Sequence, residues 1–267
     1  MIYNDFDIIN YQKPKISNFI ESLWYKVYIL VSFIFLNVKT ILKLNTIFQV
    51  QGYIWKELYI MAVRTLPIIL VTSIFIGGVT AWSAAFQFSD YIPLNYLGVA
   101  VGKSVATELA PVLTALVFAG RIGSAIAGEI GTMKVGEQID AMKVLNLDII
   151  KYLVIPKVVA ASIALPVLTI FSDVFSVLGA WLVAKFLVNL ETIIFFRGLK
   201  LFLNTFDVYF GIGKAFIFGY IIAIVASFYG FKTEGGAVGV GNTTKDSVIT
   251  VSVLILITDA IIWILMK

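Results

Sequence analysis

The chain has 267 residues, of which 60% are hydrophobic and 13% are charged, and its mean hydropathy is +0.97. A water-soluble domain carries roughly a quarter charged residues, so this composition excludes an ordinary soluble protein. There is no cysteine and no histidine, which excludes disulfides, thiol nucleophiles, Cys/His metal sites and imidazole acid–base chemistry. We interpret the net charge of +4 as basic residues flanking membrane spans, and we expect no nucleic-acid partner.

The first 50 residues are expected to stay at the membrane surface. Residues 1–15 are polar and lack a cleavable apolar core, so we expect no signal peptide. The apolar run Val27–Leu36 is too short to cross a bilayer and lies between Trp24 and several lysines. This pattern predicts an interfacial helix on the cytoplasmic face, and a tilted additional span is the alternative.

Five apolar stretches are long enough to be transmembrane helices. They cover Leu58–Phe86, Leu97–Met133, Lys151–Val188, Val208–Phe231 and Asp246–Met266. Basic residues are frequent before the first span and after the second and fourth, which predicts a cytoplasmic N-terminus. The sequence therefore predicts an all-α integral membrane protein with five transmembrane helices, because the short alternating strands of a membrane barrel do not appear.

Small residues form two parallel rows along the second span. One row consists of Ala119, Gly123, Ala127 and Gly131, and the other consists of Gly120, Ser124 and Gly128. Small residues at this spacing let another helix approach closely. We expect the two rows to form a close interface with another helix or subunit, while ordinary packing within one bundle remains the alternative for any single glycine.

Charged residues punctuate the same span at Glu108, Arg121 and Glu129. At about 1.5 Å per residue they lie roughly 20 Å and 12 Å apart, so they do not pair with one another along one helix. Each needs another partner, water or a cavity. We expect Glu108 to line a cavity or the outer interface, and Arg121 and Glu129 to lie near the cytoplasmic interface.

Other ionisable residues also lie in apolar surroundings: Asp173, Lys214 and Asp259. Each is a candidate for an interhelical ion pair, although the sequence does not select its partner.

A polar segment, Lys134–Asp148, follows the second span. Its period predicts a short amphipathic helix with one apolar side, formed by Ile139, Met142, Val144 and Leu145. The acidic residues on its other sides favour a protein partner over an anionic membrane surface; a helix resting on lipid headgroups is the alternative.

A glycine-rich segment, Lys232–Lys245, is predicted to be a loop between the fourth and fifth spans. It lacks the G-x-x-x-x-G-K-[ST] pattern and no strand precedes it, so we do not interpret it as a phosphate-binding loop. No other nucleotide motif appears. We expect this chain to bind no cofactor and to have no catalytic residue, so any ATP and Mg²⁺ would be bound by a partner chain.

The segment ELAPVLTALVFAGRIGSAIAGEIGTMKVGEQIDAM, residues 108–142, resembles the MlaE/TGD1 family of ABC transporter permeases, which handle lipids in bacterial and plastid envelopes. The glycine-rich GGAVGVGNTTKDSV before the last span resembles the same family, and the resemblance runs from about Glu57 to the C-terminus. We therefore divide the chain into a polar tail with an interfacial elbow helix, residues 1–50, and an MlaE-type permease domain, residues 51–267.

The resemblance implies a homodimer with an ABC ATPase on the cytoplasmic side and an MCE-domain lipid-binding protein on the opposite face. It implies that the ATPase docks on a coupling helix formed by Glu137, Gln138, Ile139, Asp140 and Ala141. It also places Glu108 at the family's acidic position near a lipid cavity between the two copies. Thr107 stands where many members have Arg, and Gly136 stands where many have Thr or Ser.

The expected function is that of a permease subunit that moves phospholipid, in a bacterial inner membrane or, as the alternative, a plastid inner envelope. Its expected partners are the ATPase, a second copy, the MCE-domain protein and membrane lipids. A second hypothesis is an ion- or proton-coupled transporter that uses Glu108, Asp173 and Asp259 as relays. A third is a membrane scaffold without transport.

Overall fold

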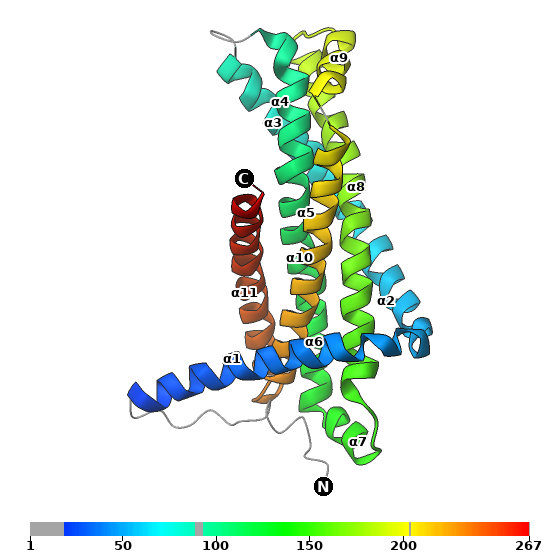
Figure 1. Cartoon of the computed structure of the whole chain (residues 1–267), viewed down its shortest axis with the longest axis vertical. Helices are drawn as coiled ribbons and strands as arrows, with labels where there is room; N and C mark the ends of the chain where they lie inside the picture. Colours follow the sequence, from blue (N-terminus) through cyan, green and yellow to red (C-terminus); the bar gives the residue numbers. More distant parts are fainter. Residues whose placement is uncertain (1–18, 89–92, 203, 267) are drawn as a thin grey trace.

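The computed structural model describes residues 19–88, 93–202 and 204–266, and every regular element within these ranges is a helix. The expected polar tail, residues 1–15, lies outside them. Long helices run side by side along one axis, and one helix lies across them (Figure 1). The prediction of an all-α membrane protein is confirmed, since six helical stretches within the described ranges are long and apolar enough to cross a membrane.

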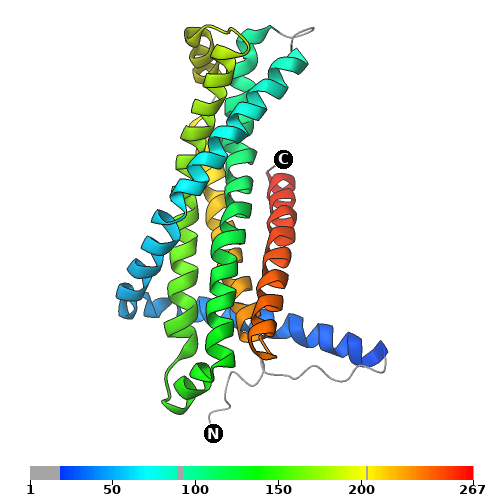
Figure 2. The ribbon, with the colours of Figure 1, turned by 180° about the vertical axis from the view of Figure 1, so that it is seen from behind.

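The N-terminal helix α1 (Phe19–Leu42) lies across the bundle near one end, followed by a 3-10 segment, Lys43–Gln49 (Figures 1 and 2). This stretch is longer than the apolar run that we expected, so by length and composition it also qualifies as a span. Within it, Asn37 and Thr40 donate side-chain hydrogen bonds to carbonyls one turn back, so their polar groups are satisfied inside the helix. Its crosswise direction supports the interfacial interpretation, so we count five spans.

The first span is two helices, α2 (Gln51–Val63) and α3 (Leu66–Phe88). The break falls at Arg64 and Thr65, just before Pro67. Pro67 is the second residue of α3, where proline is tolerated because the N–H that it lacks would have no partner in the first turn of a helix, so a new helix begins just before it.

The second span is one continuous helical stretch with two π-helical turns. It consists of α4 (Leu97–Ser104), α5 (Ala110–Phe118) and α6 (Ser124–Val135), joined by π turns at Val105–Leu109 and Ala119–Gly123. The two π turns contain Glu108 and Arg121, respectively. Such turns are frequent at functional sites because they expose backbone groups and re-aim side chains.

The rest of the bundle follows in chain order. The elements are α7 (Gln138–Val144), a π turn (Ile150–Val154), α8 (Ile155–Phe186), α9 (Thr192–Phe202), α10 (Thr205–Phe231) and α11 (Gly236–Leu265). Helix α7 lies at one end of the bundle and α9 at the other (Figure 1). The α8 span is the most buried of the candidate spans, and α11 is the least buried.

Close glycine contacts hold α3 against α8. A methyl group on Gly77 would come within 1.7 Å of the Ser176 carbonyl oxygen, and one on Gly179 within 2.1 Å of the Ile74 carbonyl oxygen. The two backbones therefore touch at two points, an approach that only residues without a Cβ permit.

The prediction of a glycine-rich loop over residues 232–245 is wrong for most of its length. Helix α11 begins at Gly236, and the turn before it has positive φ angles of 85° at Gly235 and 70° at Gly236. Threonine side chains in this stretch form hydrogen bonds within the helix and to the segment just after α10. Thr243 accepts or donates a 2.8 Å hydrogen bond with Thr233 and donates another to the Gly239 carbonyl.

Candidate functional site

A buried lysine, Lys214 on α10, joins three elements of the bundle. Its Nζ lies 2.7 Å from Glu108 Oε1, 2.8 Å from Asp259 Oδ1 on α11, and 3.2 Å from the Thr107 carbonyl oxygen. An ammonium has three donors, so these contacts use all of them. The rings of Phe210 and Trp263 lie 4.8 Å and 5.1 Å from Nζ and add cation–π attraction.

The backbone of α10 approaches the second span closely enough to make this cluster. A methyl group on Gly211, one turn before Lys214, would come within 2.2 Å of the Ala106 carbonyl oxygen. The π turn presents the Thr107 carbonyl to Lys214, while the Thr107 hydroxyl donates to the Lys103 carbonyl at 2.8 Å. Thr107 therefore contributes a backbone carbonyl to the cluster.

The cluster carries one more carboxylate than ammonium, provided that all three groups are ionised. The Lys214 side chain is fully buried, whereas the Glu108 side chain is 31% exposed. Glu108 is thus both an ion-pair partner and the open edge of the cluster. Two of the residues that the sequence singled out, Glu108 and Asp259, are brought together through Lys214.

Asp173 on α8 does not join them. Its Oδ1 is buried, and no hydrogen bond reaches that atom from the part of the chain that the structure describes. The three carboxylates of the relay hypothesis therefore do not form one hydrogen-bonded site.

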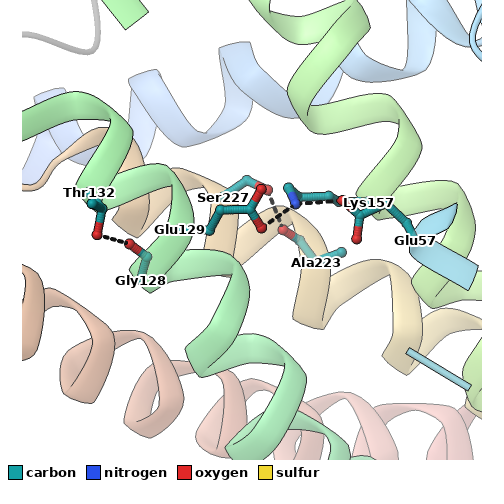
Figure 3. A network of polar contacts seen from close by, with 7 residues as sticks. All are labelled: Glu57, Gly128, Glu129, Thr132, Lys157, Ala223 and Ser227. Atoms are coloured by element: carbon teal, nitrogen blue, oxygen red, sulfur yellow. Dashed lines mark hydrogen bonds and ion pairs between the residues drawn. The ribbon is translucent and has the colours of Figure 1, made fainter. Parts of the chain in front are cut away.

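A second charged network, drawn in Figure 3, borders the same cavity as Met142 of α7. Lys157 on α8 donates to Glu129 Oε2 on α6 at 2.7 Å and to Glu57 Oε1 on α2 at 2.8 Å. Glu129 thus has the partner that the sequence required but did not identify. Neither Glu57 nor Lys157 was predicted as a site residue, although a lysine within the apolar run IPKVVAAS was a signal.

The two small-residue rows have different surroundings. The row of Ala119, Gly123, Ala127 and Gly131 is buried in the chain's own bundle. A methyl group on Gly123 would lie 3.4 Å from Ile222 of α10. The other row is more open. None of the described residues lies within 4 Å of a methyl group added to Gly120. Gly128 and Ser124 are half-buried, and Arg121 is exposed.

Helix α7 is anchored on one side and exposed on the other. Ile139 is buried, while Glu137, Gln138 and Ala141 are exposed. Asp140 bonds Lys143 at 2.8 Å and lies 3.7 Å from Lys134. The Lys143 hydrogen bond lowers the pKa of Asp140 from its usual value.

One prediction for this helix is wrong. Val144 and Leu145 are 87% and 70% exposed and do not share the buried side with Ile139, because the helix ends at Val144. Gly136 lies before this helix. It ends α6, and Glu137 takes a left-handed conformation with φ 56° before α7 begins.

The chain after α7 is tied to the segment after α1. Lys43 donates a hydrogen bond to Asp148, and Lys151 donates another to Gln49. Partial burial alone would raise the pKa of Asp148, but the Lys43 contact and backbone hydrogen bonds lower it below its usual value.

These features define a multi-pass helical membrane protein with ion-pair networks between its helices and a short helix exposed at one end. Residues 54–265 match the sequence model described as Permease MlaE. The chain therefore belongs to the MlaE family of ABC transporter permeases.

Relatives cover most of the chain. Proteins named "Probable ABC transporter permease protein" from Rickettsia typhi and Synechocystis are 39% and 38% identical over 209 and 204 residues. Those alignments cover 78% and 76% of this chain and 81% and 78% of the relatives. A protein with the same description from Porphyra purpurea is 37% identical over 196 residues, which are 73% of this chain and 74% of the relative. An ABC permease works with an ATPase partner.

Proposed function

We propose that this chain moves phospholipid between envelope membranes, driven by an ABC ATPase that docks on α7. The observation that carries the proposal is the exposed, charged surface of α7 at the end of the bundle. Glu137, Gln138 and Ala141 are open on this surface, while Ile139 anchors the helix from behind. A helix held in this way can transmit a movement of the docked ATPase to the helices that it contacts.

The connections of α7 suggest how that movement would travel. Only Gly136 and Glu137 separate α7 from α6, the continuation of the span that contains Glu108. On its other side, Asp148 is bonded to Lys43 in the segment after α1. Movement of α7 would therefore shift the second span and the interfacial helix together. ATP and Mg²⁺ would be bound and used by the partner, with no catalytic residue in this chain.

The proposed cargo follows from the charge and surface of the spans. Helix α11 exposes a long apolar face, including Ile249, Val253 and Ile257, and the Lys214 cluster beside it leaves the Glu108 carboxylate partly open. Apolar walls with one polar group suit a lipid with a polar headgroup. We propose that a second copy packs against this surface and encloses a lipid cavity with it, and that an MCE-domain protein binds at the α9 end.

The proposed membrane is the bacterial inner membrane, with α7 on the cytoplasmic side. Lysines are concentrated before the first span and around α7, which supports this orientation.

Co-purification tests the proposal. The tagged chain is extracted in mild detergent with its ATPase, and the double variant Glu137→Lys/Asp140→Lys is compared with wild type. Reversing both charges on α7 should abolish ATPase recovery while bound phospholipid, measured by mass spectrometry, is retained. Glu191→Lys, an exposed reversal before α9, is the matched control and should recover the ATPase normally. Unchanged recovery with the double variant would refute the docking assignment.

A further inference from the structure

A cavity of about 560 Å³ opens beside the Lys157 network, bounded by α2, α6, α7 and the start of the α8 span. Six of its lining residues matter here: Tyr53, Lys56, Glu57, Glu129, Tyr152 and Lys157. No residue of the Lys214 cluster lines it. Its volume lies within the range of roughly 300–1,000 Å³ typical of small-molecule sites.

The charged side chains of this cavity are only partly satisfied by one another. Lys157 is almost completely buried and contacts one oxygen of each carboxylate, Oε1 of Glu57 and Oε2 of Glu129 (Figure 3). The second oxygen of each carboxylate remains an acceptor, and the Glu129 side chain is 54% exposed. The carboxylates therefore present negative charge to an occupant that donates hydrogen bonds.

A positive group lines the same cavity. Lys56 is exposed, and no described carboxylate lies within ion-pair distance of its ammonium. The cavity thus offers free carboxylate oxygens and a free ammonium, a pattern that complements a zwitterion and does not complement a simple anion or cation.

The remaining walls are apolar and aromatic. They include Met133, Met142, Leu147, Leu153 and Pro156. The Tyr53 and Tyr152 rings pack edge to face with centroids 6.2 Å apart. Trp55 and Tyr59, on the same helix as Tyr53, are exposed in the manner of the aromatic residues that mark a membrane interface.

From this arrangement we propose that the cavity binds the headgroup of a zwitterionic phospholipid with a primary ammonium, of the phosphatidylethanolamine type. The ammonium donates to the free oxygens of Glu129 and Glu57, and the phosphate lies against Lys56. A quaternary ammonium has no N–H to donate, so a choline headgroup fits less well. With the orientation in the proposed function, this cavity would face the inner leaflet. The binding of the headgroup itself does not depend on that orientation.

Native mass spectrometry of the purified full chain tests the site. The protein is titrated with phosphatidylethanolamine, phosphatidylcholine or phosphatidylglycerol with identical acyl chains. Phosphatidylethanolamine should be retained about tenfold more strongly than either of the others, the factor expected for a charge-assisted hydrogen bond. Glu129→Gln should reduce that preference at least about threefold, since this partly exposed side chain contributes less than a buried one. Glu191→Gln, which removes one charge outside the cavity, should not.

A second variant separates occupancy from charge. Met133→Trp fills the cavity and leaves its charges in place, so it should also remove the preference for phosphatidylethanolamine. Soluble glycerophosphoethanolamine should not displace the lipid at equal concentration, because it lacks the chains that pack on the apolar walls. Equal retention of the three lipids by wild type, an unchanged preference in either variant, or displacement by the soluble headgroup would overturn the proposal.

ATPase recovery is measured on the same preparations. Loss of the lipid preference with normal ATPase recovery is the result expected of Glu129→Gln. Absence of the ATPase from wild type, with the lipid preference intact, would contradict only the proposed function.

Discussion

The Lys214 ammonium neutralises carboxylates from two elements that the sequence separates widely. Glu108 belongs to the second span and Asp259 to the last, and both reach the same nitrogen atom. Neither Lys214 nor Asp259 is exposed enough to rely on water, so each side chain depends on the other. The residue that the sequence treats as one of several isolated charges is therefore the centre of a site.

Removing that lysine should be costly. Lys214→Met leaves two carboxylates without their cation, which typically costs about 3 kcal/mol or more when a buried pair is broken. We expect a clear drop in the thermal unfolding temperature in detergent. Lys200→Met, at an exposed position on α9, should leave that temperature unchanged. The triple variant Lys214→Met/Glu108→Gln/Asp259→Asn should recover most of the loss, because it removes the uncompensated charge. A Lys214→Met protein as stable as wild type would show that water already compensates the carboxylates.

The Lys43–Asp148 contact should make the anchoring of α7 sensitive to acid. The pKa of Asp148 is lower in the folded protein than its ordinary value of 3.8, so the folded state binds fewer protons there than the unfolded state. The stabilisation is therefore complete above about pH 4, and it is lost as the pH falls through the folded pKa.

Asp148→Asn tests this linkage. Both partners are about one-third exposed, so we expect only about 0.5 kcal/mol of destabilisation at neutral pH. The stability difference from wild type, followed by chemical unfolding, should begin to shrink as the pH falls below 3.8 and should vanish only below the folded pKa of Asp148. Glu191→Gln should show no such convergence. A difference that grows as the pH falls would reverse the sign of the linkage and refute it.

At the level of the elements, the α3–α8 contact depends on a glycine, Gly77, that lets the two helix backbones approach closely. Gly77→Ala would drive a methyl group into the Ser176 carbonyl, so the helices must separate. Overpacking of this kind typically costs about 1–3 kcal/mol. We expect a lower unfolding temperature and a lower yield of folded protein. Gly213→Ala, at a helical glycine with nothing within 4 Å, is the matched control and should cost nothing. Equal unfolding temperatures of the two variants would show that α3 and α8 can move apart without a loss of stability.

The sequence predicted the spans better than it predicted their contacts. Apolar length placed α8 and α10 within a few residues of their observed bounds. Composition misled at α11, where glycine and threonine suggest a loop, but the chain is helical from Gly236. Bilayer thickness sets the length of an apolar span, whereas residue propensity is only a weak guide to where a helix begins.

The site was recovered only in part, for a related reason. Glu108, Glu129 and Asp259 stood out because a charge within an apolar run can be recognised from the local sequence alone, without knowledge of its partner. Their partners did not follow, because pairing depends on the π turn at Val105–Leu109 and on the close approach at Gly211. The same holds for the α3–α8 seam, whose two glycines lie in different spans and form no row in the sequence.

At the level of the whole molecule, the row of Gly120, Ser124 and Gly128 on the second span is open at its start. Among the described residues of one copy, a methyl group on Gly120 would meet nothing within 4 Å, and the neighbouring α11 is the least buried of the candidate spans. Small, open faces of membrane helices are suited to close approach by another helix. Together with the proposed homodimer, this geometry suggests that Gly120 lies where the second copy packs.

Gly120→Phe should therefore weaken self-association without unfolding the monomer, because the added ring has room in one copy and none at a close interface. The absence of cysteine in the chain lets Glu191→Cys serve as a single labelling position, so energy transfer between donor- and acceptor-labelled copies in liposomes measures dimer formation. We expect Gly120→Phe to lower the apparent dimer affinity, obtained from the energy transfer, at least about tenfold. This corresponds to a loss of about 1.4 kcal/mol of association free energy. Gly213→Phe, at an equally open and exposed glycine on α10, should leave the transfer unchanged. If both variants dimerise like wild type, the open row faces lipid and the two copies meet elsewhere.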